Sequence, residues 1–207
     1  MALNQIKLEK FINNLITYSD SNKVDNQYKK DIQVNNLKRY FENMYLIQPS
    51  ILLVGEAPGY QGCAITGVPF TSEFILITHR DCDALNGCNA LGNKKEPTAT
   101  MVWGVLDEKE KEGKLFSKPL MWNIFPFHPI KAGDIHTNRK PSDEECVYGY
   151  NVLNDLLALF PTIEKIYAIG KAADKKLNGH PKYAGALRHP SNGGKKEFVE
   201  GINKIYS

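Results

Sequence analysis

No stretch of this sequence is apolar for long enough to cross a membrane. Its longest apolar runs, such as residues 51–54 and 156–160, have the length of elements in a protein core, whereas a transmembrane helix needs roughly 20 residues. The first residues, MALNQIKLEKF, carry charges where a signal peptide would need an apolar stretch. We therefore expect a cytoplasmic protein with no membrane partner.

Cysteine is scarce and irregularly spaced. The four cysteines are Cys63, Cys82, Cys88 and Cys146, and none of them belongs to a CxxC pair. Such pairs are typical of zinc and iron–sulfur sites, so their absence favours reduced, partly buried thiols. We expect neither a metal nor an organic cofactor; a metal site at Cys82 and Cys88 is the alternative.

The sequence also lacks internal repeats, low-complexity segments and a Pro/Gly/Ser-rich linker. Its net charge of +3 permits a nucleic-acid partner but does not argue for one. Hydrophobic residues make up 42% and charged residues 24% of the 207 positions, as in compact globular proteins. A chain of this length supports one well-packed core. We expect a monomer with a single domain over residues 1–207, including a helical segment, residues 1–48, that packs on the rest.

Strands and helices are predicted to alternate along the chain. Continuous apolar runs predict buried strands at residues 51–55, 120–125 and 165–170. Periodic apolar residues predict helices at residues 3–15, 37–45, 74–79, 98–109 and 194–206, a short helix from Lys171, and one that begins at the capping box of Ser142 and Glu145. The alternation indicates an α/β domain with a mostly parallel sheet. In such sheets the ligand site lies in the loops beyond the carboxyl ends of the strands.

Two motifs follow the first predicted strand. GEAPG, residues 55–59, has a tight backbone path and exposed amides that can approach a phosphate or a small planar ligand closely. A plain turn between a strand and a helix is the alternative. In GVPF, Phe70 follows a proline in a loop and can stack on a base; a core role is its alternative.

Two further motifs come later in the chain. In WNIFPFHP, Asn123 lies in an otherwise apolar strand, and a buried carboxamide needs matched partners, either backbone groups or a ligand. His128 in the same motif is interpreted as structural. RHPSNGG presents an imidazole, a hydroxyl and bare amides. A nucleophilic pair of Ser191 and His189 is disfavoured, because a proline separates them and no GxSxG motif is present.

The order of these motifs resembles that of the uracil-DNA glycosylase superfamily. GEAPG and GVPF are similar to its thermostable, iron–sulfur branch. The fuller set, with EPTATMVW, WNIFPFHP, NRKPS and RHPSNGG, is similar to a bacterial glycosylase-like subgroup. The resemblance spans residues 50–205 and implies a three-layer α/β sandwich around a mostly parallel, four-stranded sheet. It also implies an enzyme of base excision repair whose partner is DNA.

The resemblance assigns roles to the residues at matching positions. Phe70 would stack on the base, and Asn123 would read its edge by donating to O4 and accepting from N3–H of uracil. His189 would donate to O2, where negative charge builds as the bond breaks, and Glu56 would be the second catalytic residue. The residues that would face the sugar and the scissile bond are Gly55, Glu56, Ala57, Pro58 and Gly59.

The turn after His189 would contact DNA. Its members are Ser191, Asn192, Gly193 and Lys195, and Arg188 and Lys195 would pair with phosphates. The base must first leave the stack, which favours single-stranded DNA or a mismatched duplex.

Some positions depart from the family pattern. Ala57 stands where other branches carry an aspartate or an asparagine. In the branches with aspartate, this residue orients water, so Glu56 is the nearest carboxylate that could orient water here. Gly59 stands where strict uracil enzymes have a tyrosine that excludes the thymine methyl, which implies tolerance of 5-substituted uracils. No cysteine precedes Cys63, so the iron–sulfur cluster is expected to be absent. The turn also lacks the leucine wedge of some relatives.

The leading hypothesis is a monofunctional DNA glycosylase that removes uracil or a related deaminated base. The alternative, motivated by Ala57, is a weak or inactive glycosylase-fold module that binds modified bases or single-stranded DNA. A third hypothesis is a hydrolase of nucleosides or other small N-glycosides, which a neutral pocket mouth would favour.

Overall fold

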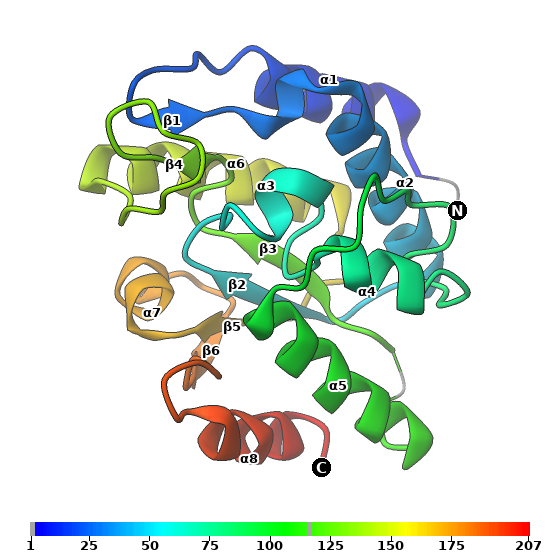
Figure 1. Cartoon of the computed structure of the whole chain (residues 1–207). Helices are drawn as coiled ribbons and strands as arrows, with labels where there is room; N and C mark the ends of the chain where they lie inside the picture. Colours follow the sequence, from blue (N-terminus) through cyan, green and yellow to red (C-terminus); the bar gives the residue numbers. More distant parts are fainter. Residues whose placement is uncertain (1–2, 116) are drawn as a thin grey trace.

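The computed structural model describes residues 3–115 and 117–207. At its centre is a parallel four-stranded sheet in the order β3–β2–β5–β6. The strands are β2 (Ile51–Gly55), β3 (Leu120–Asn123), β5 (Lys165–Ile169) and β6 (Tyr183–Leu187). Figure 1 shows α1, α2 and α6 above the sheet and α5 and α8 below it. The three-layer α/β fold predicted from the sequence is confirmed.

The C-terminal ends of the strands lie side by side. Gly55 at the end of β2 is paired with Asn123 at the end of β3, and Ile169 of β5 is paired with Leu187 of β6. Since all the pairings in this sheet are parallel, the loops that follow these residues leave the sheet at one end. The strand predicted at residues 120–125 is observed as β3. It ends at Asn123, two residues earlier than predicted, because the chain turns there.

The fourth strand, β6, has no counterpart among the strands located from the sequence. Its sequence, YAGAL, is made largely of small residues, and only its last residue is buried. An edge strand of this kind shows no continuous apolar run, so hydrophobic periodicity does not reveal it.

Most predicted helices are confirmed with shifted ends. They are α1 (Gln5–Ile16), α2 (Asp31–Ile47), α4 (Glu73–Thr78), α5 (Pro97–Lys111), α6 (Asp143–Leu159), α7 (Lys171–Leu177) and α8 (Lys195–Ile205). The predicted capping box is present, with Ser142 Oγ accepting from Glu145 N and the Glu145 carboxylate accepting from Ser142 N. The short elements α3 (Cys63–Thr66), η1 (Gln27–Lys29) and the antiparallel pair β1 (Val24–Asp25) and β4 (His128–Pro129) were not predicted.

An aromatic cluster joins the N-terminal helices to the sheet. The rings of Phe11 in α1 and Phe41 in α2 lie 5.9 and 5.8 Å from the ring of Trp122 in β3. Trp122 is completely buried, and the ring of Phe160 at the end of α6 lies 5.6 Å from the ring of Phe41. This packing holds β3 rigidly, so the residue that ends the strand, Asn123, has a fixed position.

Candidate active site

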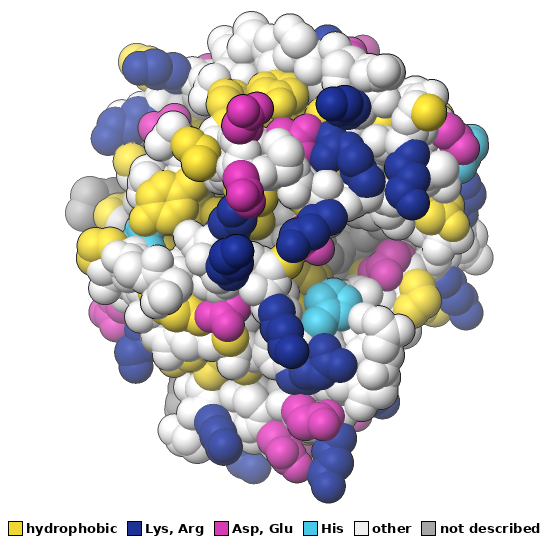
Figure 2. Space-filling model, turned by 90° about the vertical axis from the view of Figure 1, so that its left-hand side faces the viewer, with side chains coloured by type: hydrophobic (Ala, Val, Ile, Leu, Met, Phe, Trp, Pro, Cys, Tyr) yellow, Lys and Arg dark blue, Asp and Glu magenta, His cyan; other side chains and the backbone are white. Residues whose placement is uncertain are grey.

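The loops that leave the C-terminal ends of the strands enclose a pocket of about 430 Å³. Figure 2 shows this face of the molecule, where a hollow is bordered by histidine, acidic and basic side chains. The predicted site residues that line the pocket are Gly55, Glu56, Ala57, Pro58, Gly59, Phe70, Asn123, Arg188, His189, Ser191 and Asn192. Gly193 and Lys195 are exposed and lie outside this lining.

The side chains of Phe70 and Asn123 both lie beside the Cα atom of Gly55. A Cβ atom at position 55 would lie 2.5 Å from Phe70 Cζ and 2.9 Å from Asn123 Oδ1. Atoms cannot approach so closely without displacement, so this position requires glycine. The missing side chain lets the aromatic ring and the amide face the same space.

The backbone of Phe70 is strained. Its φ of 53° lies in the left-handed region, which is uncommon for a bulky residue. The Phe70 carbonyl accepts a hydrogen bond from Trp103 Nε1 at 3.0 Å, which helps to hold this conformation. Strained residues persist only where their surroundings fix them, and they cluster at binding and active sites. The strain therefore supports a ligand role for the ring.

Asn123 has a side-chain amide with no protein partner among the residues that the structure describes. The residue is only 5% exposed, and its amide faces the pocket. A buried carboxamide is costly when its donors and acceptor are unmatched. Both groups are thus available to a ligand.

His189 follows β6 and packs against Gly170, where an added Cβ atom would lie 3.2 Å from His189 Cβ. Its Nδ1 accepts a hydrogen bond from Ser191 N at 3.2 Å and lies 2.7 Å from Ser191 Oγ. A backbone N–H can only donate, so Nδ1 carries the lone pair and the proton of the neutral ring is on Nε2. His189 therefore offers a donor to the pocket.

The charge state of His189 follows from its surroundings. Burial lowers the pKa of His189; the negative charge of Glu96 opposes this effect and the positive charge of Arg188 reinforces it. The net result is a pKa below the ordinary value of 6.5. The imidazole is neutral at neutral pH, which suits a hydrogen-bond donor to a developing anion.

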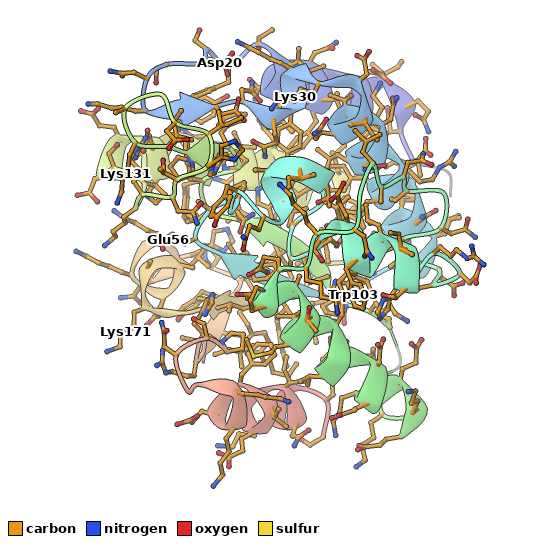
Figure 3. All side chains as sticks on the ribbon, in the orientation of Figure 1. Asp20, Lys30, Glu56, Trp103, Lys131 and Lys171 are labelled. Carbon is orange, nitrogen blue, oxygen red and sulfur yellow. The ribbon has the colours of Figure 1, made fainter. Side chains whose placement is uncertain are left out.

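Glu56 is the acidic residue of the GEAPG loop. Burial raises the pKa of its carboxyl group, and the positive charge of Lys140 partly offsets this rise. The Glu56 carbonyl accepts from Phe125 N at 3.0 Å, which continues the contact between β2 and β3 and fixes the loop. A carboxyl group of raised pKa in a cavity is suited to proton transfer. Figure 3 labels Glu56 on the side of the molecule that faces the viewer in Figure 2.

The sequence matches the uracil DNA glycosylase superfamily over residues 43–204. The chain belongs to this superfamily. Its fold is similar to the crystal structure of wild-type SMUG2 from Pedobacter heparinus, with a TM-score of 0.72 and 19% identity over 97% of this chain and 96% of that one. No curated protein matches the sequence. The resemblance seen in the motifs is confirmed, and the chain is placed in a family of DNA glycosylases.

Sequence reasoning missed one wall of this pocket, which residues 130–140 provide. Asn138 lines the pocket, and its Oδ1 accepts from Tyr60 N at 3.1 Å. The buried His128 connects the same segment to the GEAPG loop, because its ring nitrogens lie 2.9 Å from Pro58 O and 3.1 Å from Ile135 O. His128 is thus placed for the structural role that the sequence indicates. The NRKPS motif was the available signal for this wall.

Arg139 anchors that wall to the rest of the protein. Its guanidinium donates to Lys23 O at 2.7 Å, to Ile130 O at 3.1 Å and to the carboxylate of Glu145. Arg139 lines the pocket, but its donors are engaged within the protein. Its geometry suits positioning of the segment better than binding of a phosphate.

The start of α5 forms a second wall that the sequence did not reveal. Glu96 and Thr98 line the pocket, and Glu96 caps the helix. The helix predicted at residues 98–109 is confirmed as α5, which begins one residue earlier, at Pro97. Its cap is Glu96, and glutamate is not among the residues that are preferred at this position.

Basic side chains surround the mouth of the pocket. Arg188 and Lys171 line it, and Lys140 acts electrostatically on Glu56. Figure 3 labels Lys171 and Lys131 on this side of the molecule, and Figure 2 shows further Lys and Arg side chains around the hollow. The acidic residues of the lining, Glu56 and Glu96, are half-buried, whereas Lys171 and Arg188 are exposed. The rim of the pocket is therefore mainly basic, which suits a polyanion.

The cysteines are dispersed. All four are free; Cys63 and Cys146 are buried, and Cys82 and Cys88 are partly buried. Burial raises the pKa of Cys63, which lines the pocket, to about 12. Across residues 3–115 and 117–207, no group of three or more His, Cys, Asp and Glu side chains could hold a metal ion. None of the helices in the described chain is long and apolar enough to cross a membrane.

Proposed function

We propose that this protein hydrolyses the N-glycosidic bond of uracil, or of a related deaminated base, in DNA. The observation that carries the proposal is that Phe70, Asn123 and His189 line one pocket although they are far apart in the sequence. An aromatic face, an unpaired amide and a neutral imidazole donor are groups that can hold a flipped base. The pocket, of about 430 Å³, has the size of a small-molecule site.

Selectivity would come from Asn123. Its NH₂ group would donate to uracil O4, and its carbonyl would accept from N3–H. Cytosine presents the reverse pattern and would leave buried polar groups unpaired, which costs about 1–3 kcal/mol for each group. Stacking on Phe70 would add about 1–3 kcal/mol without regard to the identity of the base.

Bond cleavage would be dissociative. The bond between C1′ and the base nitrogen breaks, its electron pair stays on the base, and an oxocarbenium-like sugar remains. His189 Nε2–H would donate to O2 and stabilise the negative charge of the leaving base. Water then adds its hydroxyl group to C1′, and its proton is transferred by way of Glu56 to the base.

The charge around the mouth favours DNA over a free nucleoside as the substrate. Arg188 and Lys171 line the pocket, and Lys195 is the exposed first residue of α8, directly after the turn of residues 191–194. Asn192 and Gly193 in this turn have φ values of 52° and 77°, so the backbone there is tightly bent. We expect this turn to contact the phosphates next to the extruded nucleotide.

The test is an assay with single- and double-stranded oligonucleotides that contain one uracil, followed by alkali. The proposal predicts alkali-labile sites with the wild type and a loss of at least tenfold in rate in His189→Ala. Release of uracil from free deoxyuridine but not from DNA would instead support a nucleoside hydrolase. Substrates with hypoxanthine, xanthine and 5-hydroxymethyluracil would identify the preferred base.

A second candidate function rests on Ala57. This residue lines the pocket and has no carboxylate to orient water. A protein that keeps the base pocket but lacks efficient catalysis would bind modified bases or single-stranded DNA. Retention of the uracil oligonucleotide without alkali-labile sites, and weaker retention by Asn123→Ala, would favour this reading.

A further inference from the structure

Glu96 is a glutamate in a position where helices normally have a shorter residue. Its two carboxylate oxygens accept hydrogen bonds from Thr98 N at 2.9 Å and Ala99 N at 2.5 Å, at the start of α5. Ser, Thr, Asp and Asn are the preferred caps, and each of them can accept from an amide in the first turn of a helix. Capping alone does not explain a glutamate that also lines the pocket.

The place of this carboxylate is well defined. A Cβ atom at Gly62 would lie 3.1 Å from Glu96 Cγ, so the stem of the side chain rests on a glycine of the loop after GEAPG. The same helix holds Phe70 through Trp103. The helix α5 therefore fixes the base-stacking ring and the Glu96 charge in one rigid unit.

Glu96 and His189 line the same pocket from different elements, α5 and the loop after β6. Figure 2 shows acidic and histidine side chains at the border of the same hollow. The other charged groups that line it are Glu56, Arg139, Lys171 and Arg188. Of these, Arg188 acts on His189 in the sense opposite to Glu96, since it lowers the pKa of the imidazole while Glu96 raises it.

We propose that Glu96 is a positioning residue for His189. The amides of α5 hold its carboxylate in place, so that a fixed negative charge lies inside the base pocket. The carboxylate balances Arg188, so that the half-buried imidazole keeps its Nε2 proton as a donor of moderate acidity. It also complements the positive charge that forms on the sugar. The meaning of this arrangement for catalysis rests on the proposed glycosylase function, but the electrostatic effect on His189 does not.

The test compares Glu96→Gln, which keeps the length of the side chain and an acceptor for α5, with Glu73→Gln. Glu73 is also buried and accepts a backbone amide, from Lys94 N at 3.1 Å, but it does not line the pocket. The titration midpoint of His189 is measured by NMR in the free protein, with the resonances assigned from His189→Gln. We expect the midpoint to fall in Glu96→Gln, because a neighbouring negative charge favours the imidazolium form. No change is expected in Glu73→Gln.

Kinetics provide the second measurement. Single-turnover cleavage of a uracil oligonucleotide should slow by about tenfold in Glu96→Gln at neutral pH, with little change in KM and with the acid limb moved to lower pH. Glu96→Asn, which carries a preferred cap residue, should reproduce both effects in a folded protein.

An unchanged His189 midpoint in folded Glu96→Gln and Glu96→Asn would overturn the inference, whatever the cleavage rate. Failure of both variants to fold, with Glu73→Gln folded, would also overturn it, because Glu96 would then act through the fold. Absence of cleavage by the wild type would refute the proposed function alone, since the titration in the free protein still reports the effect of Glu96.

Discussion

Gly55 and Phe70 are in such close contact that the ring of Phe70 occupies the place of a side chain at position 55. A Cβ atom there would lie 2.5 Å from Phe70 Cζ. Gly55→Ala should therefore displace the stacking ring, with a loss of at least tenfold in kcat/KM and about 1–3 kcal/mol of stability from overpacking. Cleavage assays and urea unfolding measure the two effects.

Gly104→Ala is the matched control for that substitution. Gly104 is exposed in α5 and an added Cβ atom meets nothing within 4 Å, so alanine should leave activity unchanged and stabilise the helix slightly. Equal activity of Gly55→Ala and the wild type would show that the Phe70 ring does not hold the base.

Asn123→Asp tests the reading of the base edge. The aspartate has no NH₂ donor for O4 of uracil, whereas its oxygens can accept from the amino group of cytosine. We expect the preference for uracil over cytosine to fall by about 10- to 100-fold, as the loss of a buried hydrogen-bond match implies. The ratio of kcat/KM for uracil and cytosine oligonucleotides measures it. An unchanged preference for uracil over cytosine would show that Asn123 does not take part in base recognition.

The elements that the sequence predicted well are those with a local signal. The buried strands β2 and β5 appear as continuous apolar runs, and the capping box of Ser142 and Glu145 marks the start of α6. Asn123 stood out because it is a polar residue in an apolar strand. In each case burial selects the residue type, so the pattern can be read without the fold.

The missed parts of the site depend on contacts between distant residues. Asn138 contributes because Tyr60 N, 78 residues away, fixes its amide. Arg139 is held by Lys23 O across 116 residues. Glu96 acts as a cap that helix statistics do not favour. The motifs NRKPS and EPTATMVW include these residues, but no periodicity encodes such long-range hydrogen bonds, so only the folded chain shows that the two segments line the pocket.

Gly59 offers a test of the substrate range. The neighbour of an added Cβ atom at this position is Asn138 Nδ2, at 4.0 Å, so the space beside the loop is open. We expect the wild type to accept 5-hydroxymethyluracil as well as uracil. In Gly59→Tyr the ring should fill this space and lower the activity ratio of 5-hydroxymethyluracil to uracil by at least tenfold.

Competition assays with both oligonucleotides in one reaction give this ratio directly. The companion variant Asn138→Ala should leave the space open and retain the activity ratio of 5-hydroxymethyluracil to uracil that the wild type shows. A ratio in Gly59→Tyr equal to that of the wild type would mean that the 5-position of the base does not face Gly59.

Glu145 ties the stability of the pocket wall to pH. Burial raises the pKa of Glu145, but hydrogen bonds from Arg139 and Ser142 outweigh it and leave the pKa below the ordinary value of 4.5. A lowered carboxyl pKa stabilises the folded state above the unfolded-state pKa, and this stabilisation is lost as the pH falls through the folded-state pKa. Glu145→Gln should therefore cost about 1–3 kcal/mol at pH 7, and the cost should shrink at pH values below 4.5.

Urea unfolding at neutral and acidic pH measures this difference, with Glu144→Gln as the control. Glu144 lies in the same first turn of α6 but is exposed, so its substitution should have little effect at either pH. Because Arg139 is the partner of Glu145 and anchors residues 130–140, Glu145→Gln should also loosen the wall that carries Asn138. Equal stability losses at both pH values would show that the ion pair with Arg139 does not hold this wall.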